Sequence, residues 1–144
     1  MKKLFFAMLF LTSAAHADDI RVEHAWARAT APGQDTAMVD LVITSAHRAR
    51  LTGFSSPVCD TGEMHAMMHE NGMMKMREVD AINLPRGSMS LEKSGYHLML
   101  VGLHEPLKEG ESVPLTLDVK EGGHEIRVKA MAEVKPLTMP MQGM

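Results

Sequence analysis

VPLTLDV, residues 113–119, alternates apolar and polar side chains along its whole length. Successive side chains of an extended chain point to opposite faces, so its apolar residues would share one face: Val113, Leu115, Leu117 and Val119. This period of two is typical of a β-strand with one face on a core and the other in solvent. The same alternation recurs in HEIRVKAMAEV, residues 124–134, so both stretches predict strands.

The rest of the chain carries the same β pattern. A β-branched run, TAMVDLVITS, covers residues 36–45, and no stretch has a sustained helical period with caps at both ends. Turn signals separate the strand-like runs: Ala31-Pro32-Gly33, Lys93-Ser94-Gly95, Lys108-Glu109-Gly110 and Gly122-Gly123. Short strands at this spacing predict an all-β fold, a two-sheet sandwich or a barrel. Pro114 has no backbone N–H, so its strand is expected to lie at a sheet edge or to begin there.

The N-terminus has the pattern of a secretory signal peptide. Lys2 and Lys3 precede a short apolar run, and Ala15-His16-Ala17 is a small-x-small cleavage pattern, so we expect cleavage after Ala17. An uncleaved membrane anchor is the alternative, but no run approaches the roughly 20 apolar residues of a spanning helix. We expect a signal peptide at residues 1–17, one soluble domain at 18–135 and a flexible Met-rich tail at 136–144.

Composition excludes several kinds of function. The chain has a net charge of −3, which becomes more negative once the signal peptide is removed, and it has no basic stripe. We therefore expect no nucleic-acid partner. Cys59 is the only cysteine, which excludes an intramolecular disulfide and CxxC redox chemistry. In an oxidising compartment such a thiol is either buried and inert or reactive, and the sequence leaves both open.

The Met-rich stretch HAMMHENGMMKM, residues 65–76, holds five methionines and two histidines. Histidine offers an imidazole nitrogen and methionine a soft thioether sulfur. Thioethers bind hard cations poorly and match Cu(I), which is soft. A single methionine is more often a core residue, because its flexible side chain fills irregular gaps. The combination with histidine favours copper.

Strand geometry narrows the choice of ligands. YHLMLVGL, residues 96–103, would place His97 and Met99 side by side on one strand face. Met74 and Met76 would likewise share a face of their own strand. His65 with either of these methionines would complete a four-ligand site if the segments adjoin. Residues alone leave Met74 and Met76 as alternatives.

The chain resembles a known family at this point. HAWARATAPGQDTAMVDLVITS, residues 24–45, is similar to the opening of the periplasmic copper chaperones called PCu(A)C. The likeness continues through SSPVCDTGEMH, GMMKMREVDAINLPRG and YHLMLVGLHEPLKEGESVPLTL and covers about residues 20–134. Its most specific part is a His, a Met eleven residues later and a distant His-x-Met, which here fall on His65, Met76, His97 and Met99.

The resemblance implies a cupredoxin-like Greek-key β-sandwich that holds one Cu(I) near its surface through these four residues. It further implies a non-enzymatic carrier that supplies copper to cytochrome c oxidase assembly, including its copper-A centre. We expect a monomer with copper-acceptor proteins as partners. Met76 and His97 are one residue closer than in the usual signature, and turn-rich residues 83–95 would absorb the difference.

Several other residues are candidates for weaker contacts. Met67, Met68 and His69 are expected in a flexible loop after His65, as transient or secondary ligands. The tail would either hold a second copper or be filler, through Met139, Met141 and Met144. The remaining histidines are interpreted as ordinary surface or structural residues: His24, His47, His104 and His124.

Other functions fit parts of the same pattern. A cupredoxin-type electron carrier would need two histidines and a thiolate, and Cys59 is the only thiol available. An exported sandwich that stores copper is a second alternative. A structural sandwich whose methionines absorb oxidants is a third.

Overall fold

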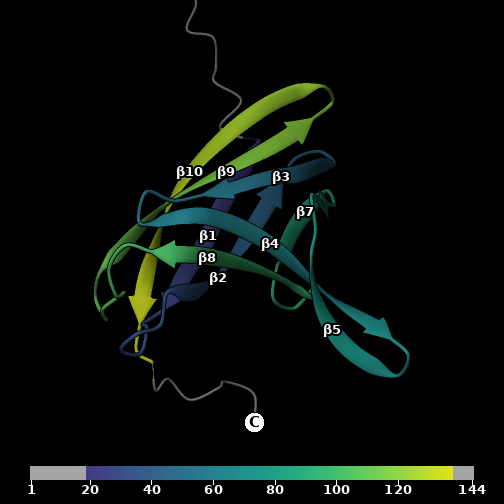
Figure 1. The fold of residues 1–144 in the computed structure, drawn as a ribbon. Coiled ribbons are helices and arrows are strands. Elements are labelled where there is room, and N and C mark those ends of the chain that lie inside the picture. Colours follow the sequence, from purple (N-terminus) through teal and green to yellow (C-terminus); the bar gives the residue numbers. More distant parts are fainter. Residues whose placement is uncertain (1–18, 138–144) are drawn as a thin grey trace, which may run out of the picture.

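The computed structural model describes residues 19–137, which form ten strands and no helix (Figure 1). The strands are β1 (Ile20–Arg28), β2 (Thr36–Ser45), β3 (Ala49–Ser55), β4 (Cys59–Glu70), β5 (Met73–Glu78), β6 (Ile82–Leu84), β7 (Gly87–Ser90), β8 (Tyr96–Leu103), β9 (Ser112–Glu121) and β10 (His124–Lys135). Within these residues no helix is long and apolar enough to cross a bilayer. The expected signal peptide and the tail methionines lie outside the described residues.

The strands follow one hydrogen-bonded path in the order β5-β4-β8-β2-β1-β10-β9-β3-β6, and β7 also pairs with β2. Most neighbours on this path are far apart in sequence, as in Greek-key folds, and β1 is parallel to β10. Figure 1 shows the β10-β9-β3 part of the path crossing over the β1-β2-β8 part. The two parts enclose one hydrophobic cluster. The predicted cupredoxin-like β-sandwich is confirmed.

Alternation builds this core. The four apolar residues of VPLTLDV are all buried, as predicted, and β2 contributes its own alternate residues: Ala37, Val39, Leu41 and Ile43. Each fully buried Leu, Ile or Val side chain stabilises the fold by about 1.5–3 kcal/mol relative to an exposed one. The intervening residues of β2 and β8 therefore face away from the core, where their side chains can contribute to a binding site.

A glycine lets the two parts of the sandwich approach closely. A Cβ at Gly62 of β4 would lie 2.1 Å from the carbonyl oxygen of Phe54 on β3. No side chain fits in that space. Gly62 therefore brings β4, the strand that carries His65, against β3.

Pro114 does not lie on an edge strand. β9 is an interior strand between β10 and β3, so the edge alternative is wrong. The strand does not begin at Pro114 either, because β9 starts at Ser112 and pairs with β10 from that residue. Pairing with β3, however, starts only at Thr116. The Pro114 carbonyl accepts a hydrogen bond of 2.6 Å from Ser56 Oγ. The absence of a backbone N–H at Pro114 therefore costs no hydrogen bond to β3, because β3 does not pair with β9 at this position.

The Met-rich stretch is a β-hairpin, so the prediction of a flexible loop at Met67, Met68 and His69 is wrong. All three residues belong to β4, which pairs with β5 along the whole stretch. Asn71 and Gly72 join the strands with φ of +51° and +79°. Asn-Gly is favoured in two-residue hairpin turns because both positions need positive φ. Figure 1 shows this β4–β5 hairpin projecting from the sandwich. The turn-rich residues 83–95 likewise contain most of β6 and all of β7.

Candidate metal centre

His65 and His97 are directly opposite each other on β4 and β8. Opposite residues of an antiparallel pair point to the same face, with Cβ atoms about 4.5–5.5 Å apart. Met99 lies two residues along β8 and shares that face, opposite Glu63 of β4. The other face of both strands is in the core, where Met64, Ala66, Leu98 and Leu100 are buried. Core packing thus holds the three predicted ligands in place on the outer face of the sheet.

A further methionine lies at this face. Met38 of β2 is directly opposite Met99, and its Sδ atom lies 3.2 Å from Nδ1 of His97. Met38 is not among the ligands predicted from the sequence. The alternation of TAMVDLVITS does place Met38 outside the core, but only the fold shows that β2 adjoins β8.

The β4–β5 hairpin carries the remaining candidates of the described chain. Met76 is opposite Met67, and Met74 is opposite His69. All four share the outer face with His65, and Met76 is two positions nearer to the histidine pair than Met74. Met68 pairs with Lys75, so its side chain points to the other face of the hairpin, away from His65.

Met76 lies on exposed β5, and its side chain is 47% exposed. β4 separates β5 from β8. Two strand spacings place the β5 backbone about 10 Å from that of β8. Met76 thus approaches the histidine pair from a projecting edge, whereas Met99 and Met38 lie on strands inside the sheet.

A carboxylate orients one imidazole. Glu63 Oε2 lies 2.9 Å from His65 Nε2. A carboxylate can only accept, so Nε2–H is the donor and Nδ1 keeps its lone pair for a ligand. Carboxylate partners of this kind fix the tautomer of metal-binding histidines and make the imidazole more basic.

More negative charge lies beside His97. The Glu92 backbone N–H donates a hydrogen bond of 3.2 Å to Asp40 Oδ1. Burial, and then a hydrogen bond with the Asp40 carboxyl, raises the pKa of the Glu92 side chain, while His97 and Arg28 act in the opposite direction. The two neighbouring carboxyl groups favour a cation at this face.

Cys59 is remote from these ligands. It is 6% exposed and belongs to the core cluster, with Sγ 3.4 Å from the Thr61 carbonyl oxygen. Burial raises the pKa of its thiol. Its six-residue separation from His65 along β4 corresponds to about 20 Å. Cys59 is therefore buried, as the inert alternative requires, and a copper centre that combines Cys59 with the histidine pair is not formed.

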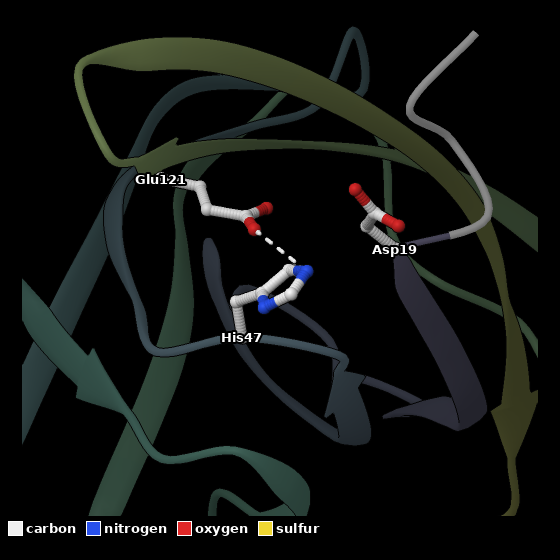
Figure 2. A group of neighbouring side chains, drawn as sticks. All are labelled: Asp19, His47 and Glu121. Carbon is white, nitrogen blue, oxygen red and sulfur yellow. Dashed lines mark ion pairs between the residues drawn. The ribbon is translucent and has the colours of Figure 1, made fainter. Parts of the chain in front are cut away.

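A second group of potential ligands lies elsewhere. Figure 2 shows Asp19, His47 and Glu121, whose ligand atoms all lie within 4.8 Å of one another. His47 Nε2 is 3.9 Å from Glu121 Oε1, and a cavity of about 260 Å³ adjoins all three residues. Asp19 precedes the Ile20–Ser45 pair at the far end of β2 from Met38, about 23 Å away along the strand. The carboxylate oxygens of Asp19 and Glu121 are harder ligands than the thioether sulfurs on the outer face of β4 and β8.

Known proteins resemble this chain in sequence and in fold. Residues 20–134 match the family described as putative lipoprotein LpqE-like. A putative lipoprotein of Leifsonia xyli subsp. xyli is 31% identical over 113 residues, which are 77% of this chain and 68% of the relative.

Solved PCuAC domains share the fold. The apo PCuAC domain of PmoF2 has a TM-score of 0.65 at 24% identity and covers 84% of this chain and 93% of its own. The copper-bound PCuAC domain from PmoF2 has a TM-score of 0.63 at 24% identity, with coverages of 82% and 93%. The predicted resemblance to PCu(A)C proteins is thus confirmed in the fold, and the chain belongs to the LpqE-like family of putative lipoproteins.

Proposed function

We propose that this protein is exported to the periplasm, binds one Cu(I) on the outer face of β4 and β8 and carries it to an acceptor protein. The observation that carries the proposal is the direct pairing of His65 with His97. Met99 and Met76 complete the proposed ligand set. No step of this function requires catalysis, so we propose a carrier and not an enzyme.

The chemistry of the donors supports Cu(I). Two imidazoles and two thioethers are neutral, and soft sulfur ligands prefer Cu(I) to hard cations. The nearby carboxyl groups of Glu63, Asp40 and Glu92 add favourable charge without supplying the soft ligands. A PCuAC domain of the same fold, from PmoF2, has been solved with copper bound.

Ligand exchange is the proposed route of release. Met76 lies on the exposed hairpin, so an acceptor can reach the metal there and replace one thioether at a time. A neutral thioether takes up no proton when it leaves, whereas protons compete with copper for imidazole nitrogen. Affinity should therefore fall with acidification through the histidines alone.

The proposed acceptors are proteins of cytochrome c oxidase assembly, including the copper-A centre or its assembly factors. This step rests on the sequence resemblance to PCu(A)C chaperones. The test mixes the Cu(I)-loaded protein with an isolated copper-A domain under anaerobic conditions, separates the two and measures copper in each. Copper that stays with this protein would contradict delivery while leaving copper binding intact.

The binding test uses the exported protein and a chromophoric Cu(I) chelator in competition. We expect one tightly bound Cu(I) per chain and a loss of at least about 100-fold in affinity for His97→Ala, the upper end of the cost of losing one orienting partner. His104→Ala is the matched control, because His104 lies 2.8 Å from Asp60 and away from the histidine pair. Equal affinity of His97→Ala and the control would show that the assigned site is wrong.

A further inference from the structure

We propose that Met38 is a copper ligand that takes the place of Met76 when the hairpin ligand is absent. The inference rests on the proposed Cu(I) function and concerns the same face. Nothing in the His, Met and His-x-Met signature assigns a role to Met38, which precedes it by 27 residues. Its position against His97 and Met99 is a property of the fold.

The side chains of Met38 and His97 are close enough to share one ion. Met38 Sδ and His97 Nδ1 are 3.2 Å apart. With metal–nitrogen bonds of about 2.0 Å and metal–sulfur bonds of about 2.3 Å, as in zinc sites, two tetrahedral ligands of one ion have their N and S atoms about 3.5 Å apart. The contact thus has nearly the separation that a shared ion requires. A small rotation of either side chain opens the space.

Met38 also lies closer to His97 within the sheet than Met76 does. Met38 lies one strand from His97, because β2 and β8 are neighbours, whereas Met76 lies two strands away. Met38 and Met99 are directly opposite each other. Three donors of neighbouring strands therefore converge, and His65 supplies a fourth from the other side of β8. This set is complete without the hairpin.

The strand that carries Met38 is fixed against the core, unlike the strand that carries Met76. The neighbours of Met38 on β2, Ala37 and Val39, are 2% and 1% exposed and fix the strand against the core. β2 itself lies between β8 and β1. Met76 instead lies on β5, all of whose residues are exposed. An anchored and an exposed thioether are thus available for the same coordination position.

A functional consequence follows from this pair. When an acceptor displaces Met76, Met38 keeps copper at full coordination until the acceptor's ligands arrive. Loss of copper to solvent is then avoided during transfer. Either methionine alone is therefore sufficient for tight Cu(I) binding, and affinity falls strongly only when both are replaced.

The experiment is a double-mutant cycle of Met38→Leu and Met76→Leu in the exported protein. Leu nearly conserves the volume of Met and removes only the sulfur, so the fold is kept. Each single variant should lose less than about 10-fold in Cu(I) affinity and the double variant more than about 100-fold, a range that spans the cost of weakened metal sites. Met131→Leu is the control for replacing a surface methionine, because the Met131 side chain is 59% exposed.

X-ray absorption at the copper edge gives a second readout, and in the Met76→Leu variant it requires no change at Met38. Met76→Leu should retain two sulfur ligands, from Met38 and Met99, and the double variant should retain one. If Met76→Leu alone drops to one sulfur, or if Met38→Leu has no effect in the Met76→Leu background, Met38 is only a neighbour of His97. Wild-type protein without bound Cu(I) would instead overturn the proposed function and, with it, this inference.

Discussion

Glu63 Oε2 lies 2.9 Å from Nε2 of His65, and both residues are on the outer face of β4. The contact sets which nitrogen of His65 is free, and the opposite residue His97 is set by the pairing of β4 with β8. The two imidazoles are therefore positioned before a metal arrives. A preformed pair of this kind is what the proposed metal site requires.

Glu63→Gln should weaken Cu(I) binding by about 10-fold, because the charged partner that makes the His65 imidazole more basic is lost. The measurement is competition with a Cu(I) chelator. Glu70→Gln is the matched control, since Glu70 is on the same strand but pairs with Arg77 at 2.6 Å. If Glu70→Gln lowered Cu(I) affinity more than Glu63→Gln, the role assigned to Glu63 would be wrong.

Gly62→Ala should destabilise the protein by about 3 kcal/mol or more, because a buried overlap forces a backbone shift. The added Cβ would meet the Phe54 carbonyl oxygen at 2.1 Å, and backbone cannot move aside as a side chain can. Gly53→Ala is the control, since its Cβ would meet the end of the Asp118 side chain at 2.9 Å. Urea unfolding measures the stability of both variants. Equal unfolding midpoints for Gly62→Ala and Gly53→Ala would contradict the close approach of β3 and β4.

The Cys59 thiol should be unreactive in the native protein. Burial raises its pKa, so less thiolate is present at a given pH than for an ordinary thiol. A chromogenic disulfide reagent should label it only in denaturant. Rapid labelling of native protein at neutral pH would contradict this assignment.

Stability should also depend on Cys59 at alkaline pH. The folded thiol keeps its proton to higher pH than the unfolded thiol, so the unfolded state is the first to lose a proton as pH rises. Stability should therefore fall as pH rises past the ordinary thiol pKa of 9.0. Cys59→Ala should lack that component of the fall, as measured by urea unfolding at a series of pH values, and its Cu(I) affinity should equal that of wild type.

Truncation after residue 137 should leave the tight Cu(I) site unchanged, because all of its proposed ligands lie on β2, β4, β5 and β8. Any copper held by Met139, Met141 and Met144 should be a second, weaker equivalent that disappears with the tail. Copper content after anaerobic loading, with and without residues 138–144, checks both statements. Loss of the first equivalent on truncation would place the tight site in the tail.

Most of the fold was predictable because burial imposes a period of two on a strand. The alternation of VPLTLDV predicted a strand and its buried face correctly, and the β-branched run TAMVDLVITS predicted a second strand correctly. Alternation failed in the Met-rich stretch, where Met67 and Met68 are consecutive and lie on both faces of β4. The Asn71-Gly72 turn signal was present in the sequence, but without visible alternation before it residues 67–69 looked like a loop, while Met74 and Met76 were correctly predicted to lie on a strand.

The sequence by itself determined the local parts of the site. An i, i+2 pair such as His97 and Met99 must share a face in any strand, whatever the strand packs against. Only the tertiary structure decided which strands are neighbours, because pairing between distant segments depends on how the whole sheet closes around its core. That closure places His65 opposite His97, brings Met38 of β2 against His97 and Met99 of β8, and carries Cys59 into the core.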